Sequence, residues 1–239
     1  MNVFEYIQHN VLHVPWVVLS ALFAGLLVLM TGMRVKSAIT NGGGVLPDEG
    51  FTIRNAMEVV VEQLSDLAKM TIGDDYRRYF PIVGTIFLFV LISNCMSLVP
   101  GLLGSTSDFN TTLAWAIISF LVYNFVGLRA HGWKYIYHLM GPTLWTPTIG
   151  GKTWHVRVLA PFFLPLELVL HLARILTLSI RLVANMFADH LVVTTWLGMI
   201  PVIVPAIFLG LGLLMSFLQA AVFSLLTMIY IGEALEESH

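Results

Sequence analysis

The chain has 239 residues, of which 57% are hydrophobic and only 11% are charged. A soluble globular domain carries about 25% charged residues, so the composition indicates one polytopic membrane domain over residues 1–239. The net charge of −2 gives no reason to expect a nucleic-acid partner, and the single cysteine, Cys95, excludes an intrachain disulfide and a cysteine-based metal cluster.

The first predicted elements are a membrane span and a surface helix. Residues 14–33 are uncharged and long enough to cross a hydrocarbon core of about 30 Å. A glycine-rich linker over 41–50 leads to residues 51–72, where charged residues recur every four positions between apolar ones. These charged residues are Arg54, Glu58, Glu62 and Asp66. Such a polar stripe predicts an amphipathic helix lying on the membrane surface.

Two more uncharged spans follow, over 81–99 and 111–128. A polar connection over 127–160 comes next, and its prolines prevent one continuous helix. The histidines of this connection match no zinc-ligand spacing, so we predict no metal site.

The last third of the chain reads as a long helical hairpin. Residues 162–196 contain no glycine, and no proline after Pro165, which predicts one helix of roughly 50 Å. Because this exceeds the thickness of the bilayer, the helix must tilt strongly. Gly198 and Pro201 turn the chain, and a second apolar helix covers 202–231. The predicted fold is all-α, with five membrane-crossing helices, one interfacial amphipathic helix and a tilted hairpin at the end.

Lysine and arginine set the predicted orientation. They gather at 34–36, 54–78 and 129–157, which share one side of the membrane if the five spans alternate. Positive residues favour the cytoplasmic side. We therefore expect a multi-pass protein with the N-terminus outside and the C-terminus in the cytoplasm.

Arg181 lies where a charge is least expected, inside the apolar run 175–193. A guanidinium cannot lose its proton, and placing one at the bilayer centre costs roughly 2.5–3.5 kcal/mol on insertion scales. No acidic residue lies three or four positions away on either side. The partner of Arg181 must come from elsewhere in the fold or from another subunit.

Polar residues gather on one face of the same predicted helix. They are Glu167, His171, Arg174, Arg181, Asn185 and Asp189, which fall within about 40° of a common direction. Gly212, Gln219, Tyr230 and Glu233 share a face of the next helix. Two such faces suggest a protein-lined path for a cation or a proton. A structural ion pair between Glu167 and Arg174 and a core role for His171 are the open alternatives, and His190 points at least about 100° away from Arg181.

Several motifs resemble one family. Residues 180–192, IRLVANMFADHLV, resemble the R-L-x-x-N-M signature of subunit a of the F-type ATP synthase. Residues 165–168 and 217–239 resemble its flanking motifs, and residues 92–101 are similar to its N-x-x-x-L-x-P turn.

This resemblance implies a non-catalytic proton-channel subunit without a cofactor, because other subunits of the complex synthesise ATP. The implied partners are the c-ring, the b subunits of the peripheral stalk and the lipid bilayer. Arg181 would be the essential cation that discharges a ring carboxylate and prevents a direct leak between two aqueous half-channels. The implied proton-pathway residues are Glu167, Asn185, Asp189, His190, Gln219, Arg174, Asn94 and Tyr230.

The chain departs from the family pattern at a few positions. Many bacterial members carry glycine and then glutamate where this chain has Asp189 and His190, and histidine where it has Gly212. Ser97 stands where some members place an acid. We infer that the acid of the external half-channel has moved to Asp189, and that Gly212 stays small to make room for it.

Two other classes of function are the alternatives. A secondary ion transporter with an intramembrane Arg/Asp/His site would predict repeated halves and a broken helix near Arg181, and the sequence shows neither. A membrane hydrolase or metalloenzyme would need histidines and acids at ligand spacing, which the sequence lacks.

Overall fold

The computed structural model describes most of the chain, namely residues 3–9, 14–40, 53–99, 101–132, 148–149, 152–153, 160–199 and 203–235. Its helices are α1 (Val3–Ile7), α2 (Trp16–Thr40), α3 (Ile53–Ile72), α4 (Tyr76–Ser97), the 3-10 turn η2 (Ser105–Ser107), α5 (Phe109–His131), α7 (Ala160–Met199) and α8 (Ile203–Leu235). The predicted all-α fold is confirmed, apart from the two-residue strands β1 (Thr148–Ile149) and β2 (Lys152–Thr153), which pair antiparallel. The predicted linker over 41–50 lies outside the described residues.

Five described helices are long and apolar enough to cross a membrane, as the sequence predicted. Their ends differ from the prediction by a few residues. α4 begins five residues before 81, because Pro81 falls in the second turn, where it removes a hydrogen bond near the helix end without breaking the helix. α5 begins before 111, because the side chain of Asp108 accepts a hydrogen bond from the backbone N–H of Asn110.

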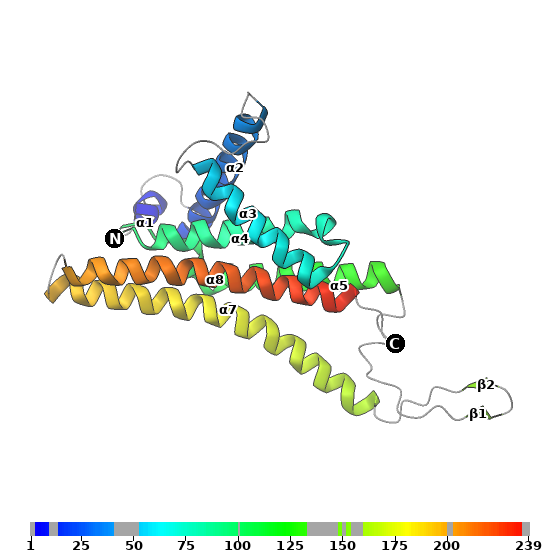
Figure 1. The fold of residues 1–239 in the computed structure, drawn as a ribbon. Helices are drawn as coiled ribbons and strands as arrows, with labels where there is room; N and C mark the ends of the chain where they lie inside the picture. The colour runs from blue at the N-terminus through cyan, green and yellow to red at the C-terminus, as the bar shows by residue number, and fades with distance from the viewer. Residues whose placement is uncertain are drawn as a thin grey trace.

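The long helices α4, α5, α7 and α8 run alongside one another, while α2 stands steeply across them (Figure 1). α8 is the central helix, because it packs against α3, α4, α5 and α7. Its side chains Phe223 and Met228 are fully buried together with Phe87 of α4 and Leu182 of α7. Van der Waals packing of such side chains stabilises the contacts among these helices, because an apolar side chain gains little by leaving lipid for the protein interior.

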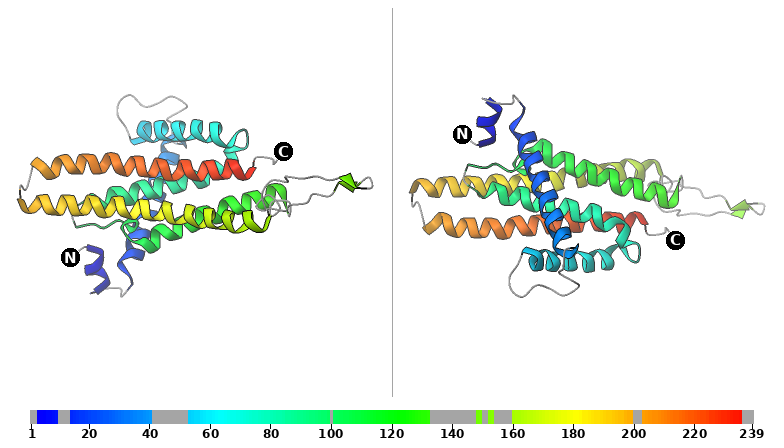
Figure 2. Two further views of the ribbon diagram at one scale, coloured as in Figure 1. Left: turned by 90° about the horizontal axis from the view of Figure 1, so that it is seen from below. Right: turned by 90° about the horizontal axis from the view of Figure 1, so that it is seen from above.

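α3 lies along the flank of α8 (Figure 2). Leu64 and Ala68 are buried against the core, whereas Glu62 and Asp66 are exposed. The predicted amphipathic helix is therefore confirmed, with its acidic stripe turned outward.

α7 is a single helix of 40 residues, so it is about 60 Å long. Its C-terminal half lies against α8, and its N-terminal part diverges from α8 (Figure 1). The predicted long hairpin is confirmed. Its tilt relative to a bilayer stays a prediction.

Candidate functional site

Arg181 lies near the middle of α7, where the polar face of this helix borders an exposed apolar flank. Its side chain is exposed. Ile180, Phe187 and Leu191 on the same helix are 53%, 63% and 52% exposed. Within the described part of the chain, Arg181 makes no hydrogen bond and no ion pair. The sequence expectation that this cation needs a partner from outside its own helix therefore stands.

One turn further along α7, the polar stripe enters the interface with α8. The side-chain amide of Asn185 donates a hydrogen bond to Oε1 of Gln219 over 3.0 Å. Gln219 is only 4% exposed, and its Nε2 has no hydrogen-bond partner among the described residues. This hydrogen bond joins α7 to α8. In the part of the chain that the structure describes, it leaves Nε2 of Gln219 without an acceptor beside the polar face of α7 that carries Arg181.

Asp189 lies one turn beyond Asn185 and faces Gly212, as antiparallel pairing of the two helices predicted. A Cβ built on Gly212 would lie 3.6 Å from Oδ2 of Asp189. That oxygen is buried and has no hydrogen-bond partner in the described structure. The nearest atom to this Cβ position is Cδ2 of Leu98, at 2.6 Å. The interpretation that Gly212 makes room for Asp189 is thus incomplete, because the side chain of Leu98, the residue directly after α4, lies closer to this position.

His190 is half-buried, and its Nε2 is buried without a hydrogen-bond partner within the described ranges. It follows Asp189 directly, so the two side chains leave the helix about 100° apart. The structure therefore agrees with the sequence in separating His190 from the face that carries Arg181.

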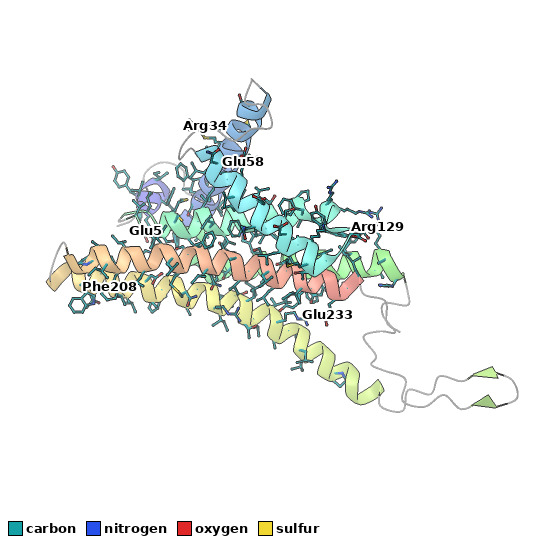
Figure 3. The ribbon with its side chains drawn as sticks, viewed as in Figure 1. Glu5, Arg34, Glu58, Arg129, Phe208 and Glu233 are labelled. Atoms are coloured by element: carbon teal, nitrogen blue, oxygen red, sulfur yellow. The ribbon has the colours of Figure 1, made fainter. Side chains whose placement is uncertain are left out.

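Arg174 belongs to a separate group at the other end of the hairpin, where Glu233 lies near the end of α8 (Figure 3). Nη2 of Arg174 is 3.4 Å from Oε2 of Glu233, and the guanidinium carbon is 3.9 Å from the ring centroid of Tyr230. The ion pair that the described residues show for Arg174 is with Glu233, and the pair with Glu167 that the sequence left open stays a prediction. The side chains of Glu167 and His171 lie outside the described residues, although both positions belong to α7.

Asn94 lies in a buried polar network between α4 and η2, which we call the hydroxyl cluster. Its members are Ser93, Asn94, Ser97, Ser105, Thr106 and Ser107. Thr106 Oγ1 donates to Oδ1 of Asn94 over 2.8 Å, and the amide of Asn94 donates to the backbone oxygen of Ser216 on α8 over 3.4 Å. Sequence reasoning named only Asn94 and Ser97 here. The run of hydroxyl residues at 105–107, directly before a helix cap, was the available signal.

The described residues contain no group of three or more histidine, cysteine, aspartate or glutamate side chains that could hold a metal ion. The arrangement instead offers the cations of Arg181 and Arg174, a half-buried carboxylate with one buried oxygen, and two helices joined by a hydrogen bond between amides. These groups can attract anions and exchange protons.

Comparison with known proteins identifies the family. Residues 14–232 match the family described as the ATP synthase A chain. The chain belongs to this family.

Relatives within the ATP synthase A chain family support this assignment over most of the sequence. ATP synthase subunit a 1 of Pelobacter propionicus is 43% identical over 187 residues, which cover 78% of this chain and 76% of the relative. Subunit a 3 of the same organism is 38% identical over 218 residues, covering 91% and 86%. ATP synthase subunit a of Geobacter sulfurreducens is 41% identical over 187 residues, covering 78% and 76%.

Proposed function

We propose that this chain is the proton-channel subunit of a rotary ATP synthase and conducts protons to and from the carboxylates of a c-ring. The supporting observation is Arg181, an exposed cation beside an exposed apolar flank of α7, with no hydrogen bond or ion pair within the described residues. A cation in this position is costly in lipid unless an anionic group faces it. A ring of membrane carboxylates supplies that group from a neighbouring subunit.

The fixed charge of Arg181 acts on each ring carboxylate in turn. A nearby cation favours the ionised carboxylate, so the ring site releases its proton beside Arg181. Transfer of that site into lipid favours the neutral acid, so the site must take up a proton before it leaves. Each proton that crosses contributes about 2.3 kcal/mol per 100 mV of membrane potential. The same charge repels protons and prevents a direct leak past Arg181.

Two groups of side chains would serve the two half-channels. On the outer side, Asp189 exchanges protons with water, and Asn185 and Gln219 continue the polar path toward Arg181. His190 flanks this path, and Asn94 supports it from the hydroxyl cluster, where hydrogen bonds to Thr106 and to the backbone of α8 hold it in place. On the inner side, the path passes Arg174, Tyr230 and the position of Glu167. Arg174 is held there by Glu233 and by the ring of Tyr230.

The subunit catalyses no covalent reaction under this proposal and needs no cofactor. Its partners are the c-ring, the b subunits of the peripheral stalk and the bilayer. It resides in a bacterial inner membrane with its N-terminus outside and its C-terminus in the cytoplasm.

The test is purification of the intact complex from native membranes and its reconstitution into vesicles. We expect a c-ring to co-purify, and ATP to drive acidification that a protonophore abolishes. Sodium-dependent transport that persists with the protonophore would overturn proton coupling. Ion uptake by the purified chain without a c-ring would instead favour the secondary transporter.

Orientation has its own test, in a Cys95→Ser background. Glu62 on α3 is exposed, and Tyr6 on α1 is 55% exposed, so a cysteine at either position is accessible. An impermeant thiol reagent should label Glu62→Cys only from the cytoplasmic side and Tyr6→Cys only from outside. Labelling of both from one side would overturn the orientation.

A further inference from the structure

Leu98 fills a notch that Gly212 leaves in α8, next to the carboxylate of Asp189. The position that a Cβ at residue 212 would take lies 2.6 Å from Cδ2 of Leu98 and 3.6 Å from Oδ2 of Asp189. A real Cβ would therefore collide with Leu98 before it met Asp189. Because Gly212 has no side chain, Leu98, which directly follows α4, can reach the interface between α7 and α8.

The backbone that carries Leu98 is held at both ends of its turn. The N–H of Leu98 donates to the backbone oxygen of Cys95 over 3.2 Å, which closes the last turn of α4. At the far end, the N–H of Gly104 donates to Oγ of Ser97 over 2.9 Å. Gly104 also approaches the carbonyl oxygen of Ser93 so closely that no Cβ would fit. Leu98 can therefore leave the notch by rotating its side chain, while its backbone stays in place.

Rotation of the Leu98 side chain out of the notch would let a water molecule reach the carboxylate of Asp189. Its Oδ2 is buried, has no hydrogen-bond partner within the described structure and lies close to the same point as a leucine methyl group. Leaving a buried polar atom unpaired is costly, and a water molecule would satisfy it. When the leucine side chain is in the notch, it takes the space that such a water would need.

We infer that Leu98 is a positioning residue that acts as an apolar plug and sets the fraction of time during which the Asp189 carboxylate meets water. This inference rests on the proposed function in one respect only, namely that proton exchange at Asp189 requires contact between its carboxylate and water. Whether Leu98 blocks access to the Asp189 side chain is a separate question. Access can be measured without any proton transport.

The experiment uses the intact complex in membrane vesicles, in a Cys95→Ser background that carries Asp189→Cys. A small cationic methanethiosulfonate reagent is added to both sides, and the mass of the subunit reports the rate of labelling. Adding Leu98→Ala should raise this rate about tenfold, which corresponds to about 1.4 kcal/mol. Leu98→Val, which removes less of the side chain and perturbs packing less, should raise it by a smaller factor.

Val99→Ala is the matched control, because Val99 follows Leu98 and is 49% exposed. A raised labelling rate with the Leu98 variants together with an unchanged rate with Val99→Ala supports the plug. An unchanged rate with both Leu98 variants, or an equal increase with Val99→Ala, overturns it.

A second measurement separates the plug from the proton relay. ATP synthesis under an imposed proton gradient is compared for the wild-type complex and for Asp189→Asn. If labelling responds to Leu98 while Asp189→Asn synthesises ATP at the wild-type rate, the plug is upheld and the proposed relay fails. If Asp189→Asn is slow while labelling ignores Leu98, the relay is upheld and the plug fails.

Discussion

Two neighbouring polar regions of this protein differ in how their side chains are hydrogen-bonded. In the hydroxyl cluster, the side chains of Ser93, Asn94 and Thr106 are completely buried and bonded to one another or to backbone. In the interface between α7 and α8, Asp189 and Gln219 each keep a buried polar atom with no hydrogen-bond partner within the described part of the chain. Native proteins pair nearly all of their buried polar groups. The hydroxyl cluster, whose polar groups are paired, thus stabilises the fold. The interface between α7 and α8, which keeps unpaired polar atoms, is the candidate for a functional site.

The largest effect should come from Arg181. Arg181→Ala should assemble but lose ATP-driven proton pumping and ATP synthesis by at least about a hundredfold, since no fixed cation remains to discharge the ring. Arg181→Lys should also fail, because an ammonium can lose its proton when desolvated. Vesicle acidification measures this. The control is Arg129→Ala, at the exposed end of α5, which should pump normally. Acidification at the wild-type rate by either Arg181 variant would remove the basis of the proposed mechanism.

The next effect concerns Asp189. Asp189→Gly should slow ATP synthesis under an imposed proton gradient by about tenfold or more, because a positioned proton-transfer group is lost. Assembly should be unaffected. Synthesis at the wild-type rate would move the relay to His190 or Glu167.

Gly212→His offers a rescue that also tests the geometry. Added to Asp189→Gly, it should restore part of the rate by returning a titratable group to the same space. Because the new Cβ would meet Leu98, the rescue should improve when Leu98→Ala is added. A rescue that Leu98→Ala abolishes would contradict this arrangement of the three side chains.

A smaller effect, of another kind, should come from the hydroxyl cluster. Thr106→Val keeps the shape of the side chain but leaves Oδ1 of Asn94 buried without its donor, which costs about 1–3 kcal/mol. The melting temperature of the complex should fall, while turnover per assembled complex stays unchanged. Thr194→Val is the control, since Thr194 is exposed and bonds only within its own helix. Slow turnover by assembled Thr106→Val would place the cluster on the proton path.

The smallest effect should come from Glu233. The side chain of Glu233 is 58% exposed, and an exposed ion pair contributes about 1 kcal/mol or less. Glu233→Gln should therefore change the melting temperature little and the rate of ATP synthesis less than twofold. A tenfold loss of rate would show that Glu233 belongs to the proton path and is more than a support for Arg174.

Much of the fold could be predicted from the sequence, because a membrane permits few kinds of backbone structure. Uncharged runs of about 20 residues become helices, since no other open segment satisfies its backbone hydrogen bonds in lipid. The long helix over 162–196 was predictable because this range contains no glycine, and no proline after Pro165. The polar faces on α7 and α8 were predictable from their spacing, because four-residue steps return to nearly the same side of a helix.

The sequence by itself determined the helices, the polar faces and the position of the charge that needs a partner, because these depend on local spacing and on the cost of polar groups in lipid. Only the tertiary structure decided which residues meet across helices. In the folded chain, Arg174 pairs with Glu233, and Asn94 is surrounded by hydroxyl groups. Leu98, directly after α4, lies in the space beside Asp189. Helical periodicity says which side a residue faces. Which neighbour it meets there depends on how far each helix slides along the next, and packing of the whole core sets that register.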